Sequence, residues 1–307
     1  MSPQSDQHKE KEHPSTYFVQ DRTNTDERAR VRIQDTMITK AMGGALPEQA
    51  DPTFFRRVID IGCGTGGWLI ETARSYPDIS LLVGVDISSR MVEFARNQAE
   101  AEQVGDRVEF HVMDVLRATE FPHKDFDLLN QRLGWSYLRT WDWPNLLAIY
   151  HHVTRLGGII RITESDVLGT STSPALTQLY DLARDALYQA GHLFTPEQDG
   201  VTGKLPDLFR YHGIKDIQTR TTLIEYHHGT EMKENFVEDI KLLFRTLEPF
   251  IRKWSHIPNN YDEIYHQASV RYSSQTVEPL DAWSLYGAPI GSRLLLHITM
   301  MIVILAF

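Results

Sequence analysis

Closely spaced glycines follow an apolar run near residue 60. The run is 58–61 (VIDI), and the glycines lie in 62–67 (GCGTGG). Glycine is needed where the backbone turns sharply and lies close to a ligand, and a helix that follows offers free N–H groups in its first turn. A strand, a glycine turn and a helix in this order predict a nucleotide-type binding site.

The glycine spacing fits two kinds of ligand. The pattern G-x-G-x-x-G, formed by Gly62, Gly64 and Gly67, is typical of a dinucleotide site. The same run also contains G-x-G-x-G, with Gly66 as its third glycine and Asp60 two residues before its first. A carboxylate at Asp60 would repel a pyrophosphate and would suit a ligand with an amino group and a sulfonium. Asp60 therefore favours S-adenosylmethionine (SAM) over NAD or FAD.

Polar residues also end the next three predicted strands. Asp86 lies about twenty residues after the glycines, where a carboxylate can accept hydrogen bonds from both ribose hydroxyls. Asp114 ends the third strand and could bind an adenine amino group. Asn130 ends the fourth, near the place where a reactive methyl group would lie.

Only a parallel sheet would bring these residues together. From residue 57 onward, short apolar runs alternate with helical stretches, which predicts βαβ units covered on both faces. We expect one Rossmann-like α/β domain with a seven-stranded sheet, an N-terminal helix, and cap helices on the substrate side. The apolar stripe of 236–254 predicts a helix that covers the substrate cavity or forms an oligomer face. The predicted strands are 58–61, 81–85, 108–112, 126–130, 158–163 and 217–226, with a last strand at 283–287.

Composition shifts divide the chain into five parts. The last part ends in 294–307 (LLLHITMMIVILAF), which falls short of the roughly 20 apolar residues of a membrane helix. We expect this tail outside the catalytic fold, as an oligomer contact, a helix on the surface, or a peripheral membrane contact. The parts are a disordered leader (1–16), an N-terminal helical lid (17–46), a SAM-binding core with cap helices near 168–210 (47–230), inserted helices plus the last strand (231–288), and a hydrophobic tail (289–307).

The polar strand ends resemble the motifs of the class I SAM-dependent methyltransferases. The segment 60–66 is similar to their first motif, and 85–88 (VDIS), 113–115 (MDV) and 156–158 (LGG) follow in matching order. The resemblance implies that Asp60 and the glycines hold the methionine end of SAM. It implies the following cofactor-binding residues: Asp60, Gly62, Cys63, Gly64 and Gly66; Asp86 for the ribose; Asp114 for the adenine; Ile87, Met91 and Val115 for the adenine pocket; and Asn130 and Gln131 beside the sulfonium.

Two further segments look like those of small-molecule tailoring enzymes, which include ubiquinone/menaquinone-type methyltransferases. They are 17–20 (YFVQ), with the helix after it, and 162–166 (ITESD). The layout is also similar to the C-methyltransferase of teleocidin-type indole-terpenoid biosynthesis. The resemblance implies methyl transfer from SAM to a small organic acceptor, with S-adenosylhomocysteine (SAH) as product, and it leaves C, O and N acceptors open.

Three side chains are candidates for the catalytic centre. Tyr17 lies in the aromatic segment that closes over the cofactor in the tailoring enzymes. Trp135 follows the fourth strand and could stabilise a cation at the methyl site. Glu164 either faces the pocket as a base or substrate anchor, or ends the fifth strand in solvent. Cys63 is explained by a small side chain in a tight turn rather than by a nucleophile.

Composition limits the partners of the protein. Its 41 acidic against 31 basic residues oppose RNA binding, and one cysteine cannot close an intrachain disulfide. The histidine pairs lack metal-ligand spacing, so no metal is expected. We expect a cytoplasmic homo-oligomer, formed through the N-terminal segment, the 236–254 helix or the tail, with no nucleic-acid partner and no integral membrane segment. The alternatives are a protein or RNA methyltransferase, a non-catalytic SAM-binding protein, and an NAD(P) oxidoreductase.

Overall fold

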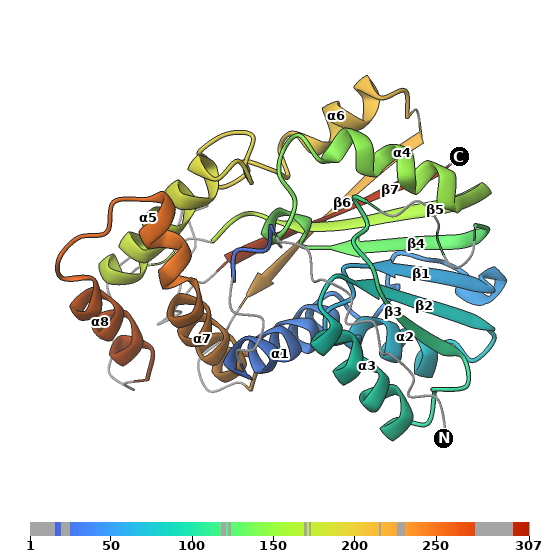
Figure 1. The fold of residues 1–307 in the computed structure, drawn as a ribbon, viewed down its shortest axis with the longest axis horizontal. Coiled ribbons are helices and arrows are strands. Elements are labelled where there is room, and N and C mark those ends of the chain that lie inside the picture. Colours follow the sequence, from blue (N-terminus) through green and yellow to red (C-terminus); the bar gives the residue numbers. More distant parts are fainter. Residues whose placement is uncertain are drawn as a thin grey trace, which may run out of the picture.

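A seven-stranded sheet forms the centre of the computed structural model (Figure 1). Its order is β3-β2-β1-β4-β5-β7-β6. The first five strands in this order run parallel, and β7 runs antiparallel to both of its neighbours. The predicted Rossmann-like α/β architecture is confirmed. The strands are β1 (Arg57–Ile61), β2 (Leu81–Asp86), β3 (Val108–Val112), β4 (Phe126–Arg132), β5 (Thr154–Ser165), β6 (Asp216–Glu225) and β7 (His297–Ala306).

The structure describes most of the chain. The described residues are 16–19, 25–117, 121, 124–168, 171, 173–214, 216–225, 231–273 and 297–306. The predicted leader, apart from Thr16, and the strand expected at 283–287 lie outside them. Among the described residues, no helix combines the length and apolar character needed to cross a membrane.

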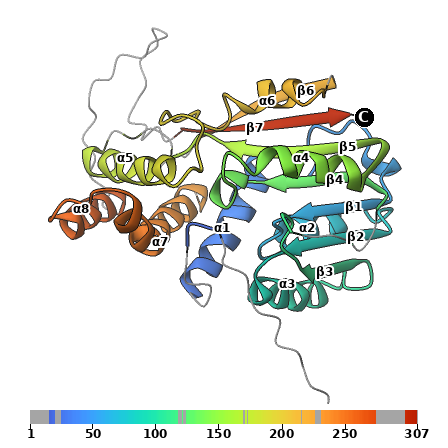
Figure 2. The ribbon, with the colours of Figure 1, turned by 45° about the horizontal axis from the view of Figure 1, so that its top comes forward.

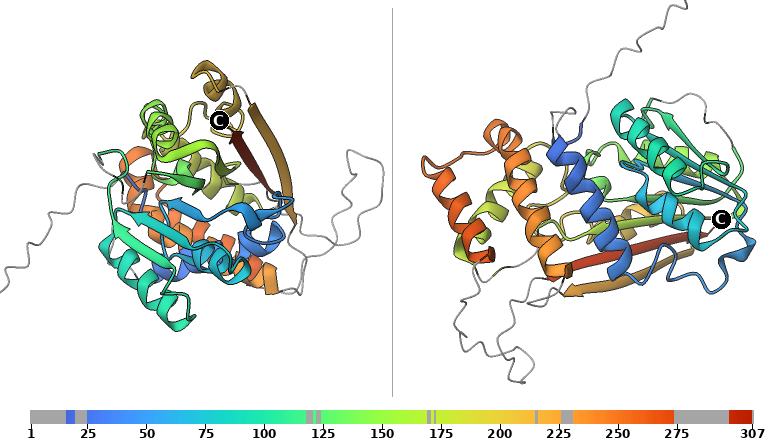
Figure 3. Two further views of the ribbon diagram at one scale, coloured as in Figure 1. Left: turned by 90° about the vertical axis from the view of Figure 1, so that its right-hand side faces the viewer. Right: turned by 90° about the horizontal axis from the view of Figure 1, so that it is seen from below.

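Helices cover both faces of the sheet and one of its ends. In Figure 1, α2 and α3 lie below the strands, and α4 and α6 lie above them. The other helices gather beyond Ser165, the end of β5, and form a cap (Figure 2). Within the cap, α1 and α7 lie side by side (Figure 3). The helices are α1 (Thr25–Ala41), α2 (Gly67–Ser75), α3 (Ser89–Ala101), α4 (Trp143–Val153), α5 (Pro174–Gln189), α6 (Leu205–Tyr211), α7 (Glu231–Trp254) and α8 (Tyr261–Ser273), with short 3₁₀ helices η1 (Pro52–Phe54) and η2 (Gly134–Ser136).

Two apolar cores lie on opposite faces of the sheet. Successive strand residues point to opposite faces, so Val58 belongs to the core under α2 and α3, whereas Ile59 belongs to the core under α4. The second core continues into the cap, where it includes Phe236 and Phe250 of α7. The apolar stripe of α7 is therefore buried within the chain.

The hydrophobic tail is a strand of the sheet, which corrects the prediction that it lies outside the fold. β7 lies between β5 and β6, and Leu305 pairs with Ile160 on one side and with Ile217 on the other. A continuous apolar run is typical of a strand in a sheet that is covered on both faces. The sequence interpretation treated the run as an appendage because another segment, 283–287, was assigned as the last strand.

Candidate functional site

A cavity of about 200 Å³ lies at the carboxyl ends of β1, β2 and β3. Side chains of α1 and of the N-terminal segment 16–19 form its remaining wall. The carboxyl edge of an open parallel sheet is where such folds bind ligands. Nine of the twelve predicted cofactor residues line the cavity: Asp60, Gly62, Cys63, Gly64, Asp86, Ile87, Met91, Asp114 and Val115.

The glycine turn has the backbone conformation that its sequence predicts. Gly62, Gly64 and Gly66 all have positive φ, between 52° and 75°. A Cβ atom at Gly62 would lie 2.8 Å from the hydroxyl oxygen of Tyr137, which closes over the turn. Cys63 is buried, and burial raises the pKa of its thiol well above the ordinary value. The thiol therefore stays protonated, in line with a packing role rather than a nucleophilic one.

Gly66 has a structural role, which corrects its assignment as a cofactor residue. It caps the N-terminus of α2 with φ 75° and does not line the cavity. A Cβ atom there would lie 2.6 Å from the Phe110 ring and 2.9 Å from the Ala95 side chain. Gly66 therefore allows α2 to pack closely on β3 and α3.

Asp86 joins the glycine turn to the start of α3. One of its carboxylate oxygens accepts a hydrogen bond from Gly64 N at 2.9 Å, and the other accepts one from Ser88 N at 2.8 Å. Each carboxylate oxygen has more than one lone-pair site, so both can still accept hydrogen bonds from ribose hydroxyls. Asp114 lines the same cavity, and its Oδ1 accepts a hydrogen bond from Leu116 N at 3.1 Å.

Charges of both signs meet at the Asp60 end of the cavity. Asp60 is 3% exposed, and burial raises its pKa to about 7, although the nearby Arg132 acts in the opposite direction. Arg132 forms an ion pair with Asp35 of α1 and donates a hydrogen bond to Thr39 Oγ1 at 3.1 Å. Asp35, Asp60 and Arg132 all line the cavity. This arrangement of one cation and two carboxylates fits the ammonium and carboxylate groups of an amino acid.

Sequence reasoning missed Asp35 and Arg132 for different reasons. Arg132 ends β4, so the rule that strand ends bind ligands would have found it if the strand had been drawn two residues longer. Asp35 lies within α1 and carries no local signal. Its role depends on how α1 packs against the sheet.

Asn130 and Gln131 lie behind the cavity, which corrects the expectation that they line the sulfonium site. Both are fully buried inside β4, because the strand continues to Arg132. Asn130 donates a hydrogen bond to Asp60 at 2.7 Å and accepts one from Arg161 at 2.8 Å. It therefore orients Asp60 from behind.

Glu164 is buried, which corrects the alternative that it ends the fifth strand in solvent, and it lines neither this cavity nor the smaller one described below. Its carboxylate accepts hydrogen bonds from Gly134 N at 2.7 Å, Trp135 N at 3.3 Å and Gln131 Nε2 at 2.8 Å. Burial raises its pKa to about 8. Glu164 thus holds the η2 turn, which carries Trp135.

A second cavity, of about 70 Å³, lies beside the first, between η2 and the cap helices. The two share four lining residues, Tyr17, Gln34, Leu133 and Ser136. The predicted catalytic candidate Tyr17 therefore lies at their boundary. Trp135, the second candidate, lines the smaller cavity, and its ring stacks on Phe18 with a centroid separation of 5.7 Å.

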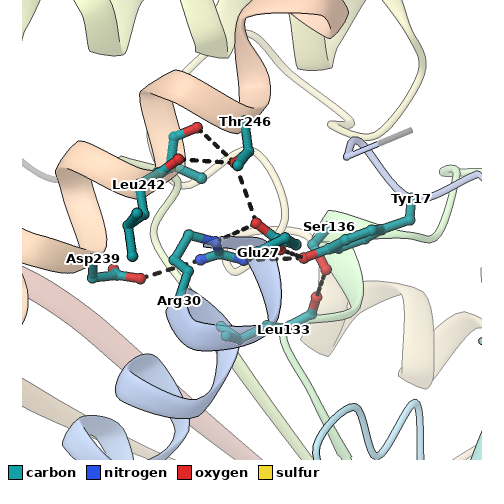
Figure 4. A network of polar contacts seen from close by, with 9 residues as sticks. Tyr17, Glu27, Arg30, Leu133, Ser136, Asp239, Leu242 and Thr246 are labelled. Carbon is teal, nitrogen blue, oxygen red and sulfur yellow. Dashed lines mark hydrogen bonds and ion pairs between the residues drawn. The ribbon is translucent and has the colours of Figure 1, made fainter. Parts of the chain in front are cut away.

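A buried ionic network ties the N-terminal segment to α1 and α7 (Figure 4). Arg30 donates to both carboxylate oxygens of Glu27, at 2.7 and 2.8 Å, and to Asp239 at 3.2 Å. The Tyr17 hydroxyl donates to Glu27, and Thr246 donates to Glu27 at 3.2 Å. Burial, followed by the charge of Glu27, raises the pKa of Tyr17 well above its usual value. Tyr17 is therefore a neutral hydrogen-bond donor and not a base.

Sequence reasoning also missed this network. Glu27 and Arg30 have the i,i+3 spacing of an ordinary surface pair on a helix, which gives no sign of burial. Asp239 was detectable, because it lies three residues after Phe236, next to Ile240 on the apolar stripe of α7. A buried acid on an apolar face requires a partner.

The family comparison identifies the sheet region. Residues 58–158 match a family model described as a methyltransferase domain. The chain carries a methyltransferase domain. The match contains the glycine turn, Asp86 and Asp114, and it confirms the resemblance to class I SAM-dependent methyltransferases. The cap and the N-terminal segment lie outside the matched residues.

Curated relatives and solved structures resemble parts of the chain. The aklanonic acid methyltransferase DauC of a Streptomyces strain is 33% identical over 135 residues, which cover 44% of this chain and 59% of DauC. The secondary metabolism regulator LAE1 of Pyricularia oryzae is 26% identical over 239 residues, 71% of this chain and 67% of LAE1. The phosphoethanolamine N-methyltransferase 2 of Haemonchus contortus, solved with SAM, gives a TM-score of 0.49 at 18% identity over 90% of this chain and 57% of that one.

The cavity of the methyltransferase domain fits SAM in its chemistry. It offers carboxylates at one end for a sugar and a base and, at the other, a mixed-charge group for an amino acid. Apolar side chains of Ile87, Met91 and Val115 also belong to the lining. Within the residues that the structure describes, no group of three or more His, Cys, Asp or Glu side chains is arranged to hold a metal ion.

Proposed function

We propose that the protein transfers the methyl group of SAM to a small organic acceptor. The observation that carries the proposal is the set of three acids, Asp60, Asp86 and Asp114, at the ends of neighbouring strands beside an open glycine turn. The three contact one cavity, so they can bind three parts of one ligand. SAM supplies an electrophilic methyl group, and the protein has to hold it in line with the acceptor.

The proposed cofactor contacts follow the polarity of the cavity. Asp86 accepts hydrogen bonds from the ribose hydroxyls, and Asp114 accepts one from the adenine amino group. At the other end, Asp60 binds the ammonium group. Arg132 binds the carboxylate of the ligand. To do so, its guanidinium has to give up part of its contact with Asp35. A guanidinium binds a carboxylate of the ligand as readily as one of the protein.

Catalysis then depends on proximity and on exclusion of water. The N-terminal segment covers the boundary between the two cavities: Thr16 donates to the carbonyl oxygen of Tyr137, and Phe18 N donates to Ser136 O at 3.2 Å. Phe18 and Val19 are each only 2% exposed. Of the four described residues that line both cavities, none is a base at neutral pH, since Tyr17 stays protonated. An acceptor whose reacting atom needs no proton removal, or already carries a free lone pair, therefore suits the site best.

The acceptor is proposed to bind in the second cavity, beside the cofactor cavity. Candidate reactions are C-methylation of a terpenoid or indole compound and O- or N-methylation of a quinone or another small metabolite. DauC, which is 33% identical to this chain over 135 residues, is named for the methylation of an organic acid, and this supports a small organic acceptor. The cytoplasmic location and the homo-oligomer also stay predictions. Light scattering of the purified protein tests the second.

The cofactor proposal is tested by calorimetric titration of the protein with SAH and, separately, with NADH. We expect micromolar or tighter binding of SAH and no binding of NADH. The acceptor proposal is tested with methyl-labelled SAM and a set of aromatic alcohols, phenols and amines, with bulk tRNA and histone as comparison. Transfer to tRNA or histone alone would replace the small acceptor with a macromolecule. NADH binding without SAH binding would reject the methyltransferase activity.

A further inference from the structure

The second cavity combines aromatic walls with carboxylates. Its lining includes two acids, Asp166 and Asp239, and one basic residue, Arg30. When these three side chains are ionised, the two carboxylates outweigh the one guanidinium and leave the lining with a net negative charge. Five aromatic side chains also line the cavity: Tyr17, Phe18, Trp135, Tyr180 and Phe236.

Arg30 pairs mainly with Glu27. Two parallel hydrogen bonds, at 2.7 and 2.8 Å, join the guanidinium to both Glu27 oxygens, and a single bond of 3.2 Å joins it to Oδ1 of Asp239. Glu27, Arg30 and Asp239 are only 2–3% exposed. One buried cation therefore serves two buried carboxylates, and Asp239 is the more weakly paired of the two.

The weak pairing has an energetic consequence. Burial raises the pKa of Asp239 to about 6, with Glu27 acting in the same direction and Arg30 against both. A buried carboxylate without a full partner carries a desolvation penalty that a second cation would relieve. The other charged group of the lining, Asp166, accepts a hydrogen bond from Thr202 at 2.7 Å, which leaves its negative charge uncompensated by this contact.

The aromatic walls suit a cation as well. Aromatic faces attract positive charge, and the guanidinium carbon of Arg30 already lies 5.9 Å from the centre of the Phe18 ring. The volume of about 70 Å³ is roughly twice the 30 Å³ that a water molecule occupies in the liquid. An ammonium head group fits such a volume, and the rest of the acceptor would extend towards the residues that both cavities share.

We propose that the second cavity selects an acceptor with a protonated amine next to an aromatic ring, with Asp239 as the counter-ion and the aromatic walls around it. This inference rests on the proposed function, since it names the class of molecule that receives the methyl group. Asp239 acts here as a binding residue for the acceptor, and the amine that it holds is distinct from the cofactor's ammonium group at Asp60.

The test uses pairs of probes that share a shape and differ in charge. Benzylamine is compared with benzyl alcohol and benzoate, and tryptamine is compared with tryptophol. Each is titrated into the full-length protein by calorimetry, with and without saturating SAH. We expect both amines to bind at least tenfold more tightly than their alcohols, and benzoate not to bind. Equal affinities within each pair, a preference for benzoate, or no binding of any probe would overturn the inference.

Matched variants locate the charge that matters. D239N keeps the shape of the side chain and should weaken amine binding at least tenfold while it changes alcohol binding less than twofold. E238Q removes the same charge from the neighbouring, solvent-exposed position of α7 and should leave amine binding unchanged. D166N is a second variant in the cavity, with an expected loss of about threefold. An unchanged amine preference in D239N and D166N would overturn the inference.

The same titrations separate this inference from the proposed function. SAH binding reports on the cofactor cavity alone, and retained SAH affinity in D239N shows that the variant is folded. If SAH fails to bind while the amine preference holds, the methyltransferase activity is rejected and the amine site stands. If SAH binds and the amine preference is absent, the activity stands and the amine site is rejected.

Discussion

The two cavities are built in different ways. The cofactor cavity draws about half of its lining from the ends of β1, β2 and β3 and the short segments after them, and the glycine turn after β1 has positive φ at three positions. The acceptor cavity takes its lining from six separate parts of the chain, namely the N-terminal segment, α1, η2, the end of β5, α5 and α7. The sheet thus determines the first cavity, whereas side-chain packing between distant helices determines the second.

The polar groups of the two cavities differ in the same way. Asp86 and Asp114 are held by hydrogen bonds that they accept from backbone N–H groups close by in the fold. Glu27, Arg30 and Asp239 are held by side chains, namely by one another and by Tyr17 and Thr246. We therefore expect substitutions in the first set to change ligand affinity, and substitutions in the second set to change the stability of the cap.

The largest expected effect is on the free energy of unfolding, after a substitution in the ionic network of the cap. Replacing Arg30 with Met leaves two buried carboxylates without a cation, and breaking a buried ion pair in this way costs about 3–5 kcal/mol. Urea denaturation should show the free energy of unfolding of R30M reduced by that amount. R32M, at an exposed position on the same helix, should change it by less than about 0.5 kcal/mol. A loss below about 1 kcal/mol in R30M would mean that the network does not hold the cap together.

A smaller effect is expected for affinity on the cofactor side. Replacing Asp86 with Ala removes two charge-assisted hydrogen bonds to the ligand, each worth about 1.5 kcal/mol or more, so SAH should bind about 100-fold more weakly. The free energy of unfolding should fall less than in R30M. D125A, which removes an exposed acid that precedes β4, is the control. If calorimetry shows unchanged affinity for SAH in D86A, Asp86 does not bind the ligand and the proposed cofactor contacts are wrong.

The substitution G66A tests whether the backbone of the glycine turn is as constrained as its geometry indicates. Alanine there requires a left-handed conformation, which costs about 1–2 kcal/mol, and its Cβ meets Phe110. G66A should therefore lower the free energy of unfolding by about 2 kcal/mol or more. Gly157 has a similar φ of 77° with nothing within 4 Å of a Cβ, so G157A should lose only the conformational part. Equal losses would show that the contact with Phe110 is relieved easily.

The smallest expected effect is a pH dependence of cofactor binding. The pKa of Asp60 is raised to about 7, and an ammonium group of the ligand binds the ionised form. At pH 6 roughly a tenth of Asp60 is ionised and at pH 8 about nine tenths, so the affinity for SAH should rise about tenfold over this range. Titrations in D60N should show no such rise. A decrease in affinity with pH would mean that protonated Asp60 binds the ligand.

The sequence was most informative where local spacing determines position. Asp60, Asp86 and Asp114 were found because each follows an apolar run at a strand end, and the ends of parallel strands meet at one edge. Asn130 and Gln131 were misplaced because nothing in the sequence shows that β4 extends to Arg132. Strand length depends on the neighbouring strands, and a shift of one residue reverses the direction of a side chain.

Residues whose role depends on long-range packing were predicted poorly. Asp35, Glu27 and Arg30 look like ordinary surface residues of a charged helix until α1 is placed between the sheet and α7. Glu164 has the right position at the end of a strand, but the η2 turn covers it. The pairing of Arg30 with Asp239 has no spacing signal, because the two residues lie about 200 positions apart in the chain.

The position of β7 has a consequence for biosynthesis. The ribosome makes β5, then β6 and the helices α7 and α8, and only afterwards residues 297–306. Because β7 is the strand that joins β6 to β5, the nascent chain holds both with unpaired edges while the cap is already synthesised. Unpaired strand edges invite pairing with other chains. The protein therefore completes its sheet only after α7 and α8 have been translated, and we expect a chain stalled before residue 297 to require chaperones to stay soluble.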